Sequence, residues 1–284
     1  MTDITKGQKR RLQSHFGLSK IPFSKYMWAA QMFDSGAQRD LLHGLVMWTE
    51  VRGIALVTGP SGVGKSITLR RFVKELDENR FHTVDFTTLP CTVNGFLRSL
   101  CRSLGLPMRL HASDLFDAAH GYLVSVEKDK GLHPILVLDD AEGLSAPVID
   151  TIRRLTAVDL DAEDRFSIVL SGSDDLLETL AHPSLVPLKT RVSYIHDLRP
   201  FGLEDTVNYV RFHLERADAN AKLFSQEATK KLFHASQGRP RAINQLAVQA
   251  LIQAAVQGCD QIDADFMSRL IAGHPFYRTK AGER

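Results

Sequence analysis

Eight consecutive residues near the start of the chain have the composition of a phosphate-binding loop. They are Gly59-Pro60-Ser61-Gly62-Val63-Gly64-Lys65-Ser66, and Ile67 continues them into a helix-like run. Glycines in such a loop let backbone N–H groups converge on a phosphate at a helix N-terminus. A lysine at this position reaches the β- and γ-phosphates, and the hydroxyl of the following serine ligates Mg²⁺. The spacing therefore predicts a site for a nucleotide with Mg²⁺.

The sequence on both sides of this loop agrees with that interpretation. The apolar run 54–58 before it is typical of a buried strand, and residues 67–73 after it have a helical pattern. The alternative is a glycine-rich turn that precedes a helix by chance. Because the lysine-serine ending and both flanking elements match the motif, we favour the phosphate loop.

A pair of carboxylates supplies the second half of this chemistry. Asp139 and Asp140 follow four apolar residues, 135–138, a pattern typical of a strand buried on both faces of a parallel sheet. Side chains at the carboxyl end of such a strand face a ligand. Asp139 is then expected to hold Mg²⁺ through water, and Asp140 to act as the base that activates the attacking water. An ordinary acidic turn is the alternative, which the phosphate loop disfavours.

The rest of the chain supplies the elements that must position these groups. Strand-like and helical segments alternate as far as Pro200, and only helical segments follow it. The alternation favours a mainly parallel sheet covered by helices on both faces. Further strands are expected at 81–86, 165–171 and 192–195, and helices at 93–104, 114–130, 145–158, 174–181, 203–217, 225–236, 239–257 and 262–272. We predict a basic N-terminal segment (1–25), an α/β nucleotide-binding domain (26–200), a small all-helical lid (201–275) and a tail (276–284).

Composition excludes several classes of protein. The chain has 284 residues, 44% of them hydrophobic and 24% charged, as expected of a globular protein and not of a disordered one. No apolar run is long enough to cross a bilayer, and residues 1–11 lack the apolar core of a signal peptide. The three cysteines lack metal-binding spacing and fit reduced thiols. We therefore expect a cytoplasmic protein with no membrane partner.

Two groups of basic residues are candidates for contact with DNA. The net charge of +2 is too small to indicate nucleic acid by itself. The N-terminal segment, however, is strongly basic, and no Asp or Glu occurs between Thr87 and Ser113. A solvated tail and a soluble helix face explain these charges as well as DNA phosphates do. The candidate contacts are Lys9, Arg10, Arg11, Arg98 and Arg102.

With these residues in place, the chain resembles an AAA+ ATPase of the ExeA-type branch over residues 16–272. Five regions carry the resemblance besides the phosphate loop. The segment 137–144 resembles the Walker B motif, and 170–176 resembles sensor 1, with Ser173 at the polar position. The segment 189–192 resembles the arginine-finger region, and 238–244 resembles sensor 2. Residues 16–18 and 21–23 are similar to the start of the branch, which the family packs near the adenine.

The resemblance implies an ATPase that uses ATP and Mg²⁺ and works as a homo-oligomer. ATP between the α/β domain and the lid is expected to be contacted by Arg241 of its own subunit and by Arg191 of the next. The family usually has Glu where this chain has Asp140, which implies slower hydrolysis, although transposition helpers of the IstB type also carry two aspartates here. Glu142 is the weaker candidate for the base.

Free-standing modules of this branch resemble the helper ATPases of DNA transposition, TniB, TnsC and Mu B. The segments 152–161 and 244–251 look closest to that group. The resemblance implies binding to double-stranded target DNA as an ATP-dependent oligomer that recruits or stimulates a DDE transposase. Two alternatives remain open. One is an ExeA-like secretion ATPase, in which this module is joined to a membrane anchor and a peptidoglycan-binding region that we do not expect here. The other is an ATP-switched protein-assembly factor without DNA binding.

Overall fold

The computed structural model describes residues 11–24, 33–86, 89–156 and 165–277, and it divides the chain into two compact units. The α/β unit is Gly36–Arg199, and the helical unit combines Pro200–Arg284 with Met1–Ser35. Residues 1–25 were expected to form a segment of their own. Of these, the described residues 11–24 belong to the helical unit. Phe23 is buried in this unit against the rings of Phe224 and His213. The resemblance placed this segment near the adenine, and these contacts do not test that placement.

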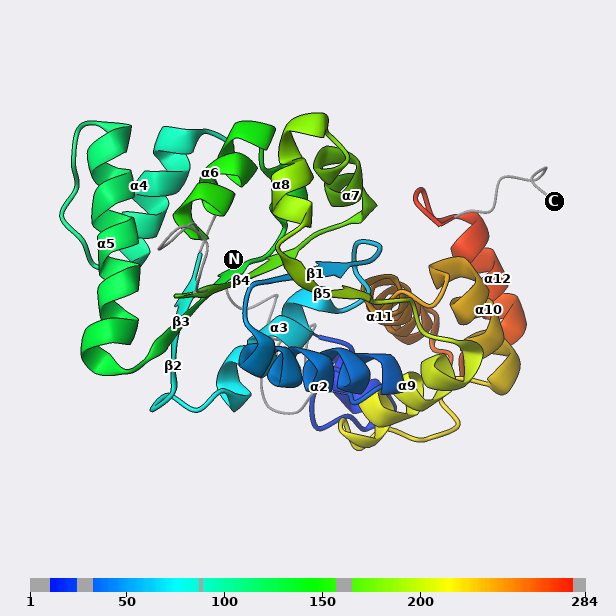
Figure 1. Cartoon of the computed structure of the whole chain (residues 1–284). Helices are drawn as coiled ribbons and strands as arrows, with labels where there is room; N and C mark the ends of the chain where they lie inside the picture. The colour runs from blue at the N-terminus through cyan, green and yellow to red at the C-terminus, as the bar shows by residue number, and fades with distance from the viewer. Residues whose placement is uncertain (1–10, 25–32, 87–88, 157–164, 278–284) are drawn as a thin grey trace. The chain divides into compact units, whose positions relative to one another are not determined.

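The α/β unit is built on five strands that all run parallel, in the order β2-β3-β4-β1-β5 (Figure 1). They are β1 (Ile54–Thr58), β2 (Phe81–Asp85), β3 (His133–Leu138), β4 (Ser167–Ser171) and β5 (Val192–Asp197). The three inner strands are buried along their whole length, whereas β5 at the edge alternates between half-buried and exposed residues. The predicted parallel sheet is confirmed, because continuous apolar runs suit strands that are covered on both faces.

Helices cover both faces of this sheet (Figure 1). Successive residues of β1 point to opposite faces, so Ile54 and Leu56 belong to one core cluster and Ala55 and Val57 to another. The second cluster contains α2 (Gly36–Val51) and α3 (Lys65–Glu75). The first contains α4 (Val93–Ser103), α5 (Ala112–Lys130), α6 (Ala146–Thr156), α7 (Asp174–Leu180) and the short α8 (Val186–Lys189).

The parallel register brings the carboxyl ends of the inner strands to one edge of the sheet. Val57 of β1 is paired with Ser171 of β4, and Leu138 of β3 is paired with Leu170. The residues that follow these strands are therefore neighbours, although they are distant in the sequence. This edge receives the phosphate loop after β1, Asp139 after β3 and Ser173 after β4.

The helical unit contains α9 (Leu203–Glu215), α10 (Gln226–Ser236), α11 (Pro240–Gln257) and α12 (Ala264–Ala272). Its core is the apolar stripe of α11, where Ile243, Leu246, Ala247 and Ala250 are all fully buried. The chain enters α11 through Gly238 at φ 67°, where any Cβ would collide with the carbonyl group of Phe201. Among the helices that the structure describes, none is long and apolar enough to cross a membrane.

Candidate nucleotide site

The loop between β1 and α3 has the backbone that phosphate binding requires. Gly59, Gly62 and Gly64 have φ values of 137°, 86° and 117°, which residues with a Cβ rarely adopt. A Cβ at Gly59 would also collide with the carbonyl oxygen of Leu198. Leu198 is held there because its N–H donates to the carbonyl of Thr58 over 2.9 Å. The end of β5 thus fixes the first turn of the loop.

Lys65 lies inside this loop as the first residue of α3. Its side chain is only 7% exposed, and Nζ donates to the carbonyl oxygens of Gly59 over 2.6 Å and Pro60 over 3.3 Å. Burial lowers the pKa of the ammonium group, while nearby carboxylates oppose the change, Glu142 most strongly and Asp139 after it. The lysine side chain therefore lies along the loop, with the carboxylates of Glu142 and Asp139 near its ammonium group.

Asp139 is oriented by a residue of the neighbouring strand. The hydroxyl of Ser171, the last residue of β4, donates to Oδ1 of Asp139 over 2.9 Å. The resemblance implied Ser173 as the functional polar residue after this strand. Ser173 is the N-cap residue that precedes α7, and its hydroxyl donates to Asp175 over 3.3 Å. Ser171 could have been found from the sequence, because it is a polar residue at the end of an apolar run. Its hydrogen bond to Asp139 could not, because that contact depends on the order of the strands in the sheet.

These residues fit ATP with Mg²⁺. The open glycine backbone of the loop and the Lys65 ammonium group suit the phosphates. The half-buried hydroxyl of Ser66, in the first turn of α3, and the oriented carboxylate of Asp139 are oxygen donors of the kind that Mg²⁺ prefers. Ser66 and Asp139 would hold the cation, directly or through water.

Asp140 and Glu142 differ in their surroundings. Asp140 has an exposed side chain and a left-handed backbone, with φ 57°, and is the N-cap residue that precedes the short helix η2 (Ala141–Gly143). Glu142 turns inward, and its Oε2 would lie 2.9 Å from a Cβ placed on Gly172, just after β4. That oxygen is buried and has no hydrogen-bond partner among the residues that the structure describes.

Arg191 lies at the opposite edge of the sheet from the phosphate loop of its own chain. It immediately precedes β5, and its carbonyl accepts from the N–H of Ile54, the first residue of β1. The length of β1, roughly 16 Å at about 3.3 Å per residue, separates Arg191 from the loop. The guanidinium group donates to Thr156 at the end of α6 over 2.9 Å. Arg191 is thus positioned away from Lys65.

The remaining predicted residues are dispersed. Arg241 is exposed in the first turn of α11, in the helical unit. Lys9 and Arg10 lie outside the described residues, and Arg11 is exposed. Arg102 is exposed on α4, and Arg98 of the same helix donates to the carbonyl of Arg109 over 3.3 Å. The structure therefore adds Arg109 to the pair of arginines that the sequence selected.

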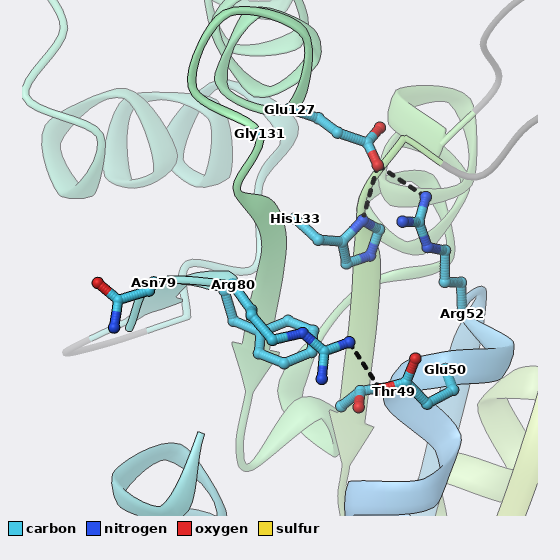
Figure 2. A pocket seen from close by; sticks show the side chains of 9 residues that line it. Thr49, Glu50, Arg52, Asn79, Arg80, Glu127, Gly131 and His133 are labelled. Carbon is cyan, nitrogen blue, oxygen red and sulfur yellow. Dashed lines mark hydrogen bonds and ion pairs between the residues drawn. The ribbon is translucent and has the colours of Figure 1, made fainter. Parts of the chain in front are cut away.

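A polar pocket lies at the amino ends of β2 and β3, the edge away from the phosphate loop (Figure 2). Figure 2 shows Glu127 between Arg52, which donates to it over 2.7 Å, and His133, whose Nδ1 is 3.4 Å away. Arg80 pairs with Glu50 across the same pocket over 2.8 Å. The opposite charges balance one another, and we interpret the pocket as a structural network rather than as part of the nucleotide site.

Comparison with known proteins finds similarity over the region that contains these residues. Residues 49–180, which include the phosphate loop and the acids after β3, match the family model described as AAA domain. The chain is 29% identical over 255 residues to the general secretion pathway protein A of Aeromonas hydrophila, a match that covers 87% of this chain and 45% of that protein. The chain thus spans less than half the length of this relative.

Solved structures share the fold at low sequence identity. The Cdc6p structure from Pyrobaculum aerophilum has a TM-score of 0.60 at 21% identity, with 88% of this chain and 68% of that chain covered. A structure of the Drosophila ORC bound to DNA has a TM-score of 0.63 at 14% identity, with 95% and 66% covered. These similarities confirm the expected AAA+ architecture of a parallel sheet with helices.

Proposed function

We propose that this AAA+ ATPase regulates DNA transposition by binding double-stranded target DNA as an ATP-dependent homo-oligomer that recruits or stimulates a DDE transposase. The observation that carries the proposal is a basic surface formed by the exposed Arg102 and Arg109 and the half-buried Arg98, which we name the α4 basic surface. The ATPase and its cofactors, ATP and Mg²⁺, are the premise. DNA binding, the oligomer and the transposase are the proposal.

The nucleotide end of the mechanism uses residues at the carboxyl edge of the sheet. The loop amides and Lys65 would bind the phosphates, and Ser66 and Asp139 would hold Mg²⁺, which when bound would supply positive charge to the transferred phosphoryl group. Ser173, at the start of α7, is proposed to orient water toward that group. These roles require no movement of the loop backbone, because its glycines already have the conformation that phosphate binding needs.

The position of Arg191 supports assembly of several subunits. Its place at the amino edge of the sheet, away from the phosphate loop of its own chain, supports a role for Arg191 at the nucleotide of another subunit. Arg241 is proposed to read the γ-phosphate from the helical unit. Loss of that phosphate would then weaken the assembly, which makes ATP a signal for binding and release.

The α4 basic surface suits DNA because positive charge and exposure coincide there. The surface is positive because no Asp or Glu occurs between Thr87 and Ser113. It is exposed because the connection from α4 to α5 faces solvent, with Met108 44% exposed and Leu110 82% exposed. Arginines that contact phosphates bind DNA with little regard to sequence and release counterions. One structural neighbour, the Drosophila ORC, is described as bound to DNA, which agrees with the proposal.

The test is binding to random duplex DNA with ATP, with ADP and at rising salt. We expect tight binding only with ATP, and an affinity that falls steeply with salt. Arg102→Ala should weaken binding to all sequences alike and lower the salt slope by about one. Lys74→Ala removes an exposed charge from α3 and serves as the control. An affinity that ignores both nucleotide and salt would exclude the transposition role.

The relative from Aeromonas hydrophila favours a second candidate, a secretion-associated ATPase. In that case the same nucleotide cycle would act on a protein partner, without DNA. Gene order separates the two candidates. A neighbouring reading frame for a DDE transposase supports the first function, and neighbouring secretion genes support the second.

A further inference from the structure

The most unusual polar group at the nucleotide site is the side chain of Glu142. Its Oε2 is buried and makes no hydrogen bond within the part of the chain that the structure describes. An unsatisfied buried carboxylate oxygen is costly, since removing it from water is not compensated by a partner. Such groups are rare in native proteins, and a ligand, an ion or a water that completes the site is a common explanation.

The fold holds this carboxylate in place through two elements. The left-handed backbone at Asp140 turns the chain after β3 into η2, which directs Glu142 toward β4. Gly172 then leaves space for it, because a Cβ at that position would lie 2.9 Å from Oε2 of Glu142. The same Cβ would also lie 2.8 Å from Leu176, so α7 closes the other side.

This position is close to the phosphate loop. The N–H of Gly172 donates to the carbonyl of Val57 over 3.0 Å, two residues before the loop begins at Gly59. Glu142 is thus held beside the strand that leads into the phosphate loop, whereas the Asp140 side chain is exposed.

We propose that Glu142, rather than Asp140, is the general base for ATP hydrolysis. Oε2 of Glu142 accepts a proton from the attacking water as the oxygen of that water bonds to the γ-phosphorus. The bond from that phosphorus to the β,γ-bridging oxygen breaks, and the electron pair leaves with ADP. The proton then passes to inorganic phosphate or to solvent. The family usually has a glutamate at the position of Asp140, and Glu142 has a side chain of that length.

The experiment compares Glu142→Gln and Asp140→Asn with Glu178→Gln, an isosteric change on the exposed face of α7. Single-turnover release of phosphate measures chemistry, and binding of a fluorescent ATP analogue measures the loaded state independently of turnover. Glu142→Gln should slow phosphate release by about a hundredfold or more, as expected for loss of a general base. Its affinity for the analogue should stay within about threefold of wild type, or about 0.7 kcal/mol. Asp140→Asn should lose less than about tenfold.

The results that would overturn the assignment are equally specific. A hundredfold loss in Asp140→Asn, with Glu142→Gln close to wild type, would return the role of base to Asp140. If Glu142→Gln weakens analogue binding and also lowers the urea midpoint, Glu142 has a structural role instead. In that case Glu142→Asp, which keeps the charge, should restore both the binding and the midpoint. The proposal depends on the ATPase alone. It therefore survives if DNA binding fails, and an inactive wild type would refute the ATPase itself.

Discussion

Ser171 and Asp139 are joined by a 2.9 Å hydrogen bond between the ends of adjacent strands, with the serine hydroxyl as donor. The bond fixes the direction of the carboxylate that we assign to Mg²⁺. Residues that orient a metal ligand contribute to affinity although they do not touch the metal. Ser171→Ala should therefore raise the Mg²⁺ concentration needed for half-maximal ATP hydrolysis by about tenfold.

The control for this change is Ser125→Ala, which removes a hydroxyl on α5 that donates to the carbonyl of Tyr122, away from the nucleotide site. Its Mg²⁺ dependence should match that of the wild type. An unchanged Mg²⁺ dependence in Ser171→Ala would show that Asp139 needs no such support, or that it is not a ligand.

Arg191→Ala should separate hydrolysis from nucleotide binding. Because the guanidinium group lies at the far edge of the sheet from its own phosphate loop, an isolated subunit should bind ATP as before. Turnover of the assembly should fall by about a thousandfold, the usual effect of an arginine finger. Lys189→Ala, two residues earlier and exposed, is the matched control.

Mixing subunits gives a sharper form of this test. A Lys65→Ala subunit retains Arg191, and an Arg191→Ala subunit retains its phosphate loop. Together they should recover part of the lost ATPase activity, because the finger of the first completes the site of the second. No recovery in mixed assemblies that form normally would contradict action between subunits.

Gly59→Ala should damage both folding and nucleotide binding. The residue has φ 137°, and its new Cβ would collide with Leu198. Strain of this kind costs about 1–3 kcal/mol, and the loop must distort to relieve it. Urea unfolding and binding of a fluorescent ATP analogue measure the two effects. Gly121→Ala is the control. At this exposed glycine of α5 a new Cβ would meet nothing within 4 Å among the described residues, so the free energy of unfolding should rise by about 0.5–1 kcal/mol.

His213 makes the stability of the helical unit depend on pH. Its side chain is buried among the rings of Phe23, Tyr209 and Phe212, and burial, aided by the charge of Arg216, lowers its pKa from 6.5 to about 4. Between these values the unfolded chain binds a proton that the folded chain does not. The free energy of unfolding should therefore fall as the pH drops from 6.5 to 4, by about 3 kcal/mol.

Replacing this histidine tests the assignment. His213→Phe should flatten the dependence of the urea midpoint on pH between 6.5 and 4. His234→Gln, at an exposed position on α10, should leave the dependence as it is. Identical curves for wild type and His213→Phe would show that other groups cause the loss of stability in acid.

The sequence by itself determined the features that depend on neighbouring residues. The phosphate loop was predictable because its glycines, lysine and serine act within eight positions of one another. The strand before Asp139 was predictable because an apolar run of that length must be buried on both faces. Apolar periodicity in the same way located the helices after Pro200.

Only the tertiary structure decided which of these elements meet. The order of the strands places Ser171 beside Asp139 and sets Arg191 at the edge away from Lys65. The turn at Asp140 directs Glu142 toward Gly172 and leaves its oxygen without a partner among the described residues. The two contacts join residues that are 32 and 30 positions apart. Packing of the whole sheet selects them, and no local pattern of residue types encodes which strand lies next to which.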